Sequence, residues 1–274
     1  MSSTTTTSTT TSVVTTTSIN ESSGTVTQYG FYFDASRCTG CRACITSCKS
    51  WNQVPAGPVF WSRLFQWETG TFPTVTVNSL FAPCYHCANP ACVPASNGAM
   101  MKEPTYGAVL IDPSQASSAN LKAAWQACPY GAISFNSDAI NSNGSKCTMC
   151  IDRLVQGLLP ICVLACQMRA LDFGTMSSLQ AKYPKAVSSL PGMPNSQGVQ
   201  PSVIFTPQDT KVQLVSYDAN YALGLFGARP SPLPQVYTNT SAVIPTQGQM
   251  NKNALNMKVS SVEELSLLMA DDNS

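Results

Sequence analysis

Charged side chains are scarce in this sequence. Asp, Glu, Lys and Arg make up 11% of the 274 residues, and the formal net charge is +1. An ordinary soluble domain has roughly 25% charged residues. Binding to nucleic acid requires a basic patch or stripe. The composition provides no such surface, and we expect no nucleic-acid partner.

Long apolar runs are also missing. No stretch reaches the roughly 18 residues that indicate a membrane-spanning helix. The N-terminus lacks the charged and apolar regions of a signal peptide. We therefore expect no membrane span and no export signal in this chain.

Cysteine, by contrast, is abundant, and its positions follow a pattern. Cys38, Cys41, Cys44 and Cys48 have the spacing C-x2-C-x2-C-x3-C, which is the ligand run of bacterial ferredoxins. In that run three thiolates bind one 4Fe-4S cluster, and the fourth reaches a neighbouring cluster. The other eight must complete the sites: Cys84, Cys87, Cys92, Cys128, Cys147, Cys150, Cys162 and Cys166.

Twelve cysteines fill three four-thiolate sites with none left over. Zinc also accepts four cysteines, and six disulfides are a further alternative. The opening run and the Cys128-Pro129 junction favour iron, because proline after the fourth ligand belongs to the ferredoxin pattern. The cysteine content is below the roughly 8 to 10% of small disulfide scaffolds.

Composition divides the chain into three parts. Residues 1–28 are mostly Ser and Thr, and we expect a disordered lead because they offer little apolar surface to bury. Residues 29–175 hold all twelve cysteines. Residues 176–274, rich in Pro, Ser, Asn and Gln, are expected to form an extended arm that contacts a partner subunit.

Short elements are expected between the cysteine motifs. Apolar, β-prone runs predict strands, and a helix is expected after Cys44, ending near Trp51. The aromatic segment 60–72 is expected to be core or to cover a cluster. The further strands and helices are expected at 29–34, 106–113, 117–127, 133–135, 170–174, 203–205, 212–215 and 261–270.

The motifs together resemble the iron-sulfur electron-transfer (beta) subunits of the molybdopterin oxidoreductase, or dimethyl sulfoxide reductase, family, including the nitrate reductase beta type. The resemblance covers about residues 29–175 and is carried by the opening run and by segments 83–92, 127–132, 146–150 and 160–166. It implies an α+β fold of tandem bacterial-ferredoxin-like domains, a double domain over 29–175, with the C-terminal arm beyond it.

The family pattern has sixteen cysteines, so four are missing here. The corresponding positions hold Ser96, Ser118, Leu121 and Ala124. In the family's crossed ligation these four positions hold one cluster, so the resemblance implies that one complete site has been lost. The three-cluster form also resembles the small subunit of pyrogallol-phloroglucinol transhydroxylase.

The same crossed ligation assigns the remaining ligands to three clusters. Cluster 1 would be bound by Cys38, Cys41, Cys44 and Cys166. Cluster 2 would be bound by Cys48, Cys147, Cys150 and Cys162. Cluster 3 would be bound by Cys84, Cys87, Cys92 and Cys128.

The resemblance implies a chain that conducts single electrons and performs no bond-making chemistry itself. Its expected partners are a catalytic subunit containing molybdopterin or tungstopterin and a soluble or docked electron carrier, with a membrane-anchor subunit as an alternative. The pterin would be bound only in the partner. A stand-alone polyferredoxin, or a redox subunit of another oxidoreductase, is the alternative function.

Residues beside the ligands are expected to tune the clusters. His86, the sole histidine, is expected to pack or hydrogen-bond near cluster 3. Backbone amides after Gly40 and Gly131 are expected to donate to sulfur. The candidate cations, which would favour the reduced form, are Arg42, Lys49, Lys146, Arg153 and Arg169.

The expected location is extracytoplasmic, with export of the folded chain alongside its catalytic subunit. The low-charge, Thr-rich composition and the N-x-S/T sequences at Asn20, Asn143 and Asn239 favour it. The cytoplasm is the alternative.

Overall fold

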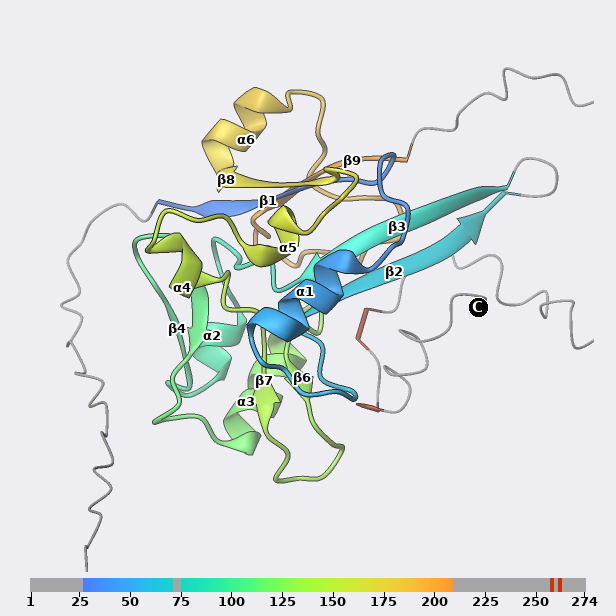
Figure 1. Ribbon diagram of the computed structural model, residues 1–274. Helices are drawn as coiled ribbons and strands as arrows, with labels where there is room; N and C mark the ends of the chain where they lie inside the picture. The colour runs from blue at the N-terminus through green and yellow to red at the C-terminus, as the bar shows by residue number, and fades with distance from the viewer. Residues whose placement is uncertain (1–26, 71–74, 209–256, 259–260, 263–274) are drawn as a thin grey trace, which may run out of the picture.

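The computed structural model describes residues 27–70, 75–208, 257–258 and 261–262 (Figure 1). The strands are β1 (Tyr29–Asp34), β2 (Ser62–Thr69), β3 (Thr76–Pro83), β4 (Met100–Lys102), β5 (Val109–Ile111), β6 (Ser134–Phe135), β7 (Gly144–Ser145), β8 (Leu171–Thr175) and β9 (Val203–Thr206). The helices are α1 (Ala43–Trp51), α2 (Cys92–Ala95), α3 (Ser118–Ala127), α4 (Ile151–Leu154), α5 (Ile161–Leu164) and α6 (Met176–Lys182).

The central sheet has the strand order β8-β1-β9. β1 pairs antiparallel with β8 and parallel with β9. Because alternate residues of a strand point to opposite faces, Phe31 and Phe33 enter the main core, whereas Tyr32 packs with Leu179 of α6. Figure 1 shows α6 covering that side of the sheet. The middle strand is thus buried on both faces.

Pairing of β1 with β8 joins the two ends of the cysteine-containing region. Phe31 lies opposite Phe173, and the amide of Asp34 donates to the carbonyl of Ala170 at 2.8 Å. Helix α1 packs on α5 close by. The opening cysteine run therefore lies beside the last cysteines of the chain.

The aromatic segment forms a long β2–β3 hairpin. Leu64, Phe65, Leu80 and Phe81 at its base are buried in the main core, while its far end projects from the body (Figure 1). The segment is therefore core at its base, in agreement with one of the two expectations. The hairpin itself was not predicted, because the aromatic residues do not alternate strictly with polar ones.

A smaller unit is formed by the residues that lie in the sequence between the β2–β3 hairpin and α4. It contains the packed helices α2 and α3 and the two-stranded sheets β4–β5 and β6–β7. The Ser117 hydroxyl caps α3 by accepting from the amide of Asn120 at 3.2 Å, which is a favoured N-cap arrangement. This capped helix supports a separate apolar cluster.

Most of the expected elements are present. The strands at 29–34, 133–135, 170–174 and 203–205 and the helix at 117–127 are confirmed within one or two residues. The strand expected at 106–113 covers only Val109–Ile111, because Gly107 has a positive φ of 72° and turns the chain. The strand at 212–215 and most of the helix at 261–270 lie outside the described residues.

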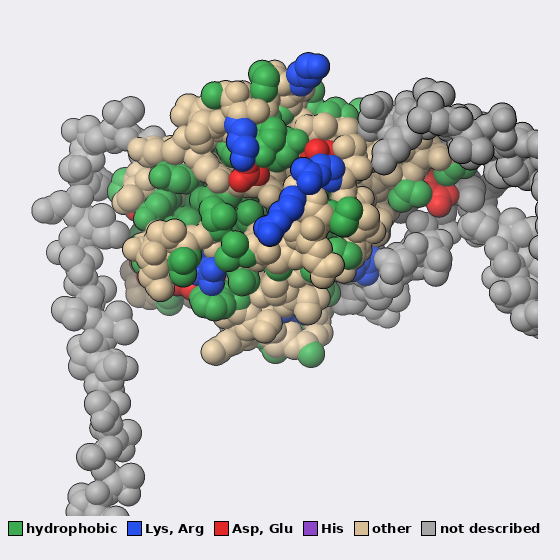
Figure 2. All heavy atoms as spheres, turned by 45° about the horizontal axis from the view of Figure 1, so that its top comes forward, with side chains coloured by type: hydrophobic (Ala, Val, Ile, Leu, Met, Phe, Trp, Pro, Cys, Tyr) green, Lys and Arg blue, Asp and Glu red, His purple; other side chains and the backbone are tan. Residues whose placement is uncertain are grey.

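The mixed helix and strand content agrees with the expected α+β class. Part of the predicted arm, α6 and β9, packs on or pairs with β1. None of the helices in the described ranges is long and apolar enough to cross a membrane. On the face in Figure 2, charged side chains are few among hydrophobic and uncharged polar ones.

Asp172 is expected to give the fold an acid-sensitive contact. Its carboxylate accepts hydrogen bonds from Lys182 Nζ at 2.6 Å and Tyr183 Oη at 2.7 Å. Burial opposes this, but the hydrogen bonds from Lys182, Tyr183 and the Phe173 amide prevail and hold the pKa of Asp172 below its usual value.

Because the folded pKa is depressed, the stabilisation is present above the unfolded pKa and is lost as the pH falls through the folded pKa. Asp172→Asn should remove this acid dependence, with a loss of less than about 1 kcal/mol near neutral pH because the pair is largely solvated. Thermal unfolding of both proteins from neutral to acid pH measures it. If the unfolding temperatures of the two proteins fell equally toward acid pH, the assignment would be contradicted.

Candidate iron-sulfur centres

All twelve cysteines are described, and all twelve are free thiols. The structure thus provides no support for the disulfide alternative. Cys41 is exposed, whereas the buried cysteines are Cys48, Cys84, Cys147, Cys150 and Cys162.

The first group of cysteines comes from both ends of the cysteine region. The thiols whose charges act on Cys44 are Cys38, Cys166 and Cys41. The same four side chains line one small cavity, which is walled by apolar residues such as Phe33, Leu64 and Phe81. Pairing of β1 with β8 brings Cys166 to the opening run.

The second group gathers around Cys162. The neighbouring thiols that raise the pKa of Cys162 are Cys147, Cys150 and Cys48, in decreasing order of effect. Cys44 of the first group also raises it, by a smaller amount. Cys48 comes from α1, Cys162 from α5, and Cys150 immediately precedes α4. The first and second groups are therefore neighbours.

The third group belongs to the region between β3 and β6. The thiols whose charges act on Cys87 are Cys84, Cys128 and Cys92. Cys84 also acts on Cys147 of the second group. The three groups thus follow one another in the order first, second, third.

Backbone amides point at sulfur in each group. The Gly40 amide donates to Cys38, and the amides of Ala132 and Tyr130 donate to Cys128. Met149 N lies 3.3 Å from Cys147 Sγ and Ala170 N lies 3.2 Å from Cys166 Sγ. The expected donation after Gly131 is present, whereas at Gly40 the donor is the glycine's own amide and not one after it. Such donors stabilise a sulfur anion.

Glycine is required at Gly131 because its φ is +55° and a Cβ would lie 3.1 Å from the carbonyl oxygen of Met257. A side chain would force the ligand loop away from the C-terminal segment. Gly131 thus permits both the turn and the amide donation that follows it.

Burial alone would keep these thiols protonated. Burial, and then the neighbouring thiols, raise the pKa of Cys44 to about 12, and burial raises the pKa of Cys48 to about 11. The pKa values of Cys147 and Cys162 are shifted well upward for the same main reason. Thiolates at these positions need a multiply charged cation beside them, and the core of an iron-sulfur cluster meets that need.

Among the described residues, no three His, Cys, Asp or Glu side chains are grouped closely enough to hold a single metal ion. In a 4Fe-4S cluster each cysteine binds a different iron, so the four sulfurs do not converge on one point. The donor set, the spacing and the amides fit such a cluster in each group.

His86 is completely buried within the third group's Cys84-to-Cys87 loop. Its Nδ1 accepts from the amide of Val109 at 2.9 Å, and burial, followed by the charge of Lys146, holds its pKa well below the usual value. It is therefore neutral, with the ring proton assigned to Nε2. That atom has no hydrogen-bond partner among the described residues.

Of the cations expected beside the ligands, Lys146 contacts a cysteine sulfur, and Lys49 and Arg153 donate to backbone carbonyls. Lys146 Nζ lies 3.5 Å from Cys84 Sγ. Lys49 instead donates to the carbonyl of Gly57 at 2.8 Å, Arg153 donates to that of Leu159 at 2.8 Å, and Arg169 is exposed. Arg42 occupies the N-cap of α1 with a left-handed backbone.

Several polar neighbours of sulfur were missed. Arg63 on β2 is buried near Cys128 and Cys84. Ser79 hydrogen-bonds Cys38, and Ser62 lies beside Cys48. A charged residue inside an aromatic-rich strand was the available signal for Arg63, whereas no spacing rule points to the two serines.

Of the four positions where the family pattern has cysteine, Ser96, Leu121 and Ala124 are buried and Ser118 is partly buried, while Ser118 and Leu121 also line a surface pocket. Leu121 and Ala124 are buried in an apolar cluster with Met100, Val109 and Ile133. Ser96 is fully buried, donating to the Val93 carbonyl at 2.7 Å and accepting from the Met100 amide at 2.9 Å. Ser118 Oγ donates to the carbonyl of Ser142 at 2.6 Å.

Fold and cysteine groups together define a ferredoxin-like iron-sulfur protein. The model of the 4Fe-4S dicluster domain matches residues 75–176. The sequence is 32% identical over 189 residues to a subunit of anaerobic dimethyl sulfoxide reductase from Escherichia coli, covering 66% of this chain and 89% of that one. It is 35% identical over 207 residues to a subunit of sulfite dehydrogenase from Allochromatium vinosum, covering 67% and 84%.

The beta subunit of a formate dehydrogenase from Megalodesulfovibrio gigas is 32% identical over 171 residues, which cover 56% of this chain and 79% of that one. The protein therefore belongs to the family of iron-sulfur beta subunits of molybdopterin oxidoreductases.

Proposed function

We propose that this chain carries single electrons through three 4Fe-4S clusters, between a molybdopterin or tungstopterin catalytic subunit and an external redox partner. Each bound cluster would accept and release one electron. The observation that carries the proposal is the grouping of the twelve cysteines into three sets of four, with the first set beside the second and the second beside the third.

The proposed ligands are those of the crossed assignment, and the electrostatic neighbours of Cys44, Cys162 and Cys87 support it. Cys44 beside Cys162, and Cys84 beside Cys147, support a linear order of clusters 1, 2 and 3. The chain itself would hold the clusters, exclude water from most of their ligands and direct amides at the sulfurs.

A count of three, in place of four, is supported by the non-ligand side chains at the fourth set of ligand positions. An iron-sulfur cluster cannot occupy the space of Leu121 and Ala124 while these side chains remain buried among apolar residues.

We infer that the 29–175 region is a double ferredoxin-like domain, with one unit around β1, α1, α5 and β8 and the other around α2 and α3.

The partner proposal rests on the named relatives, which are subunits of dimethyl sulfoxide reductase, sulfite dehydrogenase and formate dehydrogenase. We infer a catalytic chain as the first partner and propose that the C-terminal extension contacts it. The external partner would be a soluble or docked carrier. Export together with the catalytic chain is proposed from the low charge and the exposed Asn143 in an N-x-S sequence.

The test is anaerobic purification of the tagged full chain from its natural cells after fractionation into cytoplasmic and extracytoplasmic parts. We expect about twelve irons per chain and paramagnetic signals on reduction. A larger chain containing molybdenum or tungsten and a pterin should co-elute, in the extracytoplasmic fraction.

Three outcomes contradict parts of the proposal. A brown protein with the full iron content that elutes alone would favour a stand-alone polyferredoxin. About eight irons would refute the three-cluster count. Zinc without iron would indicate a structural protein with no redox role.

A further inference from the structure

A buried lysine lies between the second and third cysteine groups. Lys146 is 3% exposed. Its ammonium group lies 3.5 Å from Cys84 Sγ and donates to the carbonyl of Cys147 at 2.9 Å and to that of Val109. One cation thus touches a sulfur of the third group and the backbone of a cysteine of the second.

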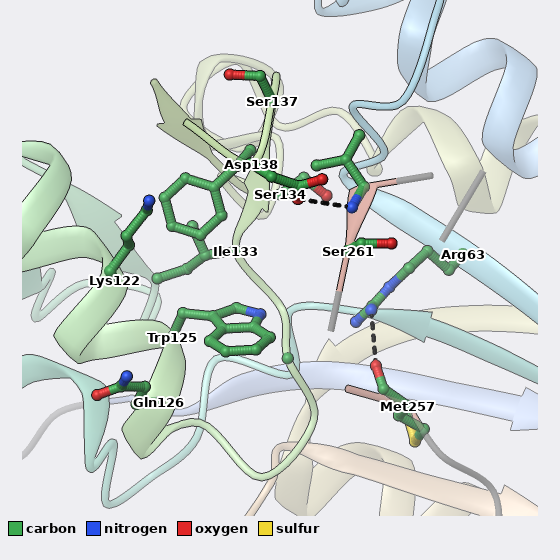
Figure 3. A pocket seen from close by; sticks show the side chains of 13 residues that line it. Arg63, Lys122, Trp125, Gln126, Ile133, Ser134, Ser137, Asp138, Met257 and Ser261 are labelled. Atoms are coloured by element: carbon green, nitrogen blue, oxygen red, sulfur yellow. Dashed lines mark hydrogen bonds between the residues drawn. The ribbon is translucent and has the colours of Figure 1, made fainter. Parts of the chain in front are cut away.

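A buried arginine flanks the third group from β2. Arg63 is also 3% exposed. Its guanidinium donates to the carbonyl of Tyr130 at 2.7 Å, two residues after Cys128, and to that of Met257 at 3.0 Å. Figure 3 shows the side chain reaching toward Met257 at the edge of a surface pocket. Arg63 therefore joins the Cys128 loop to the C-terminal segment.

Among the described residues, neither Lys146 nor Arg63 has a carboxylate partner. In the part of the chain that the structure describes, the ion pair is that of Lys182 with Asp172. A buried cation without an anion is costly, and carbonyl dipoles compensate it only in part. The groups near Lys146 and Arg63 that can become anionic include the thiols of Cys84 and Cys128.

The other two groups have a different charge environment. Beside the first group lies Arg42, which is partly exposed, and its neighbour Cys41 is open to solvent. Beside Cys150 of the second group lies buried Arg153, but the charge of Asp152 acts there in the opposite direction. Within the described ranges, a pair of buried cations without a carboxylate partner is thus found at the third group.

Resting on the three-cluster function proposed above, we propose that Lys146 and Arg63 give cluster 3 the highest reduction potential of the three. One-electron reduction adds one negative charge and makes or breaks no bond; the electron comes from the catalytic subunit or the external carrier. Two fixed buried cations favour that extra charge, because Coulomb attraction is weakly screened away from water. An electron entering the chain would therefore rest at cluster 3.

The test is a redox titration of the purified holoprotein, followed by the paramagnetic signal of each cluster. Lys146→Gln and Arg63→Gln should each lower the midpoint potential of cluster 3, the double variant should lower it further, and cluster 1 should stay unchanged. Lys146→Gln should lower cluster 2 by a smaller amount. Lys146→Arg and Arg63→Lys, which keep the charge, should stay close to the parent protein.

Lys122→Gln is the matched control, because its ammonium donates to the Ala139 carbonyl at 2.8 Å. It should leave all three potentials unchanged. Loss of cluster 3 in the Gln variants but not in Lys146→Arg or Arg63→Lys would support the requirement for charge.

Unchanged cluster 3 potentials in Gln variants with full iron would overturn the inference, and so would equal losses in the Gln and charge-keeping variants. A parent protein that assembles only clusters 1 and 2 would instead overturn the three-cluster function. Iron content and the number of signals separate the two failures.

Discussion

Replacing Cys128 with serine is expected to abolish cluster 3 and leave clusters 1 and 2 in place. Cys128 is the member of the third group that is most distant in sequence from Cys84, Cys87 and Cys92. A hydroxyl is a far poorer iron ligand than a thiolate. Iron content should fall from about twelve to about eight per chain, with loss of one reduced-state signal.

Cys166→Ser is the matched comparison, because Cys166 belongs to the first group by the same kind of long-range contact. It should remove the signal of cluster 1 and keep that of cluster 3. If Cys128→Ser removed the signal of cluster 1 or 2 while cluster 3 persisted, the crossed ligand assignment would be refuted.

The second large effect is expected from Leu121→Ala, at a position where family members have a ligand. Leu121 is 3% exposed and packs in the apolar cluster of α3. Truncating a buried leucine costs about 2–5 kcal/mol. The lower part of that range is expected, because Leu121 also borders a surface pocket whose walls can relax. The iron content should remain that of the parent protein.

Anaerobic thermal unfolding, with iron analysis beforehand, measures both quantities. Ser118→Ala serves as the control on the same helix: it removes a single hydrogen bond to Ser142 and should cost about 1 kcal/mol. Iron loss in Leu121→Ala without a lower unfolding temperature would show that this region still serves a cluster.

The local parts of the sites could be predicted from the sequence because the spacing of ligands within one loop is a local property. The run Cys38 to Cys48, the Cys128-Pro129 junction and the flanking strand β1 all follow from adjacent residues. Their grouping across the chain was predicted only through the family resemblance. No local rule links Cys44 to Cys166.

The environment of the clusters was predicted less well. Lys146 was expected beside cluster ligands because it precedes Cys147, and its ammonium group contacts Cys84. Arg63 was missed, because its nearness to Cys128 results from the β2–β3 hairpin and the long-range packing of the 130–131 loop. Sequence distance carries no information about such contacts.

The sequence by itself determined the chemistry of this protein: twelve thiols, their local spacing, a low content of charged residues and a formal net charge of +1. The tertiary structure decided which thiols meet, through the pairing of β1 with β8 and the packing of α1 on α5. It also decided that Lys146 and Arg63 are buried with no carboxylate partner among the described residues. The physical reason is that ligand identity is a property of single residues, whereas burial and charge compensation depend on groups that only folding brings together.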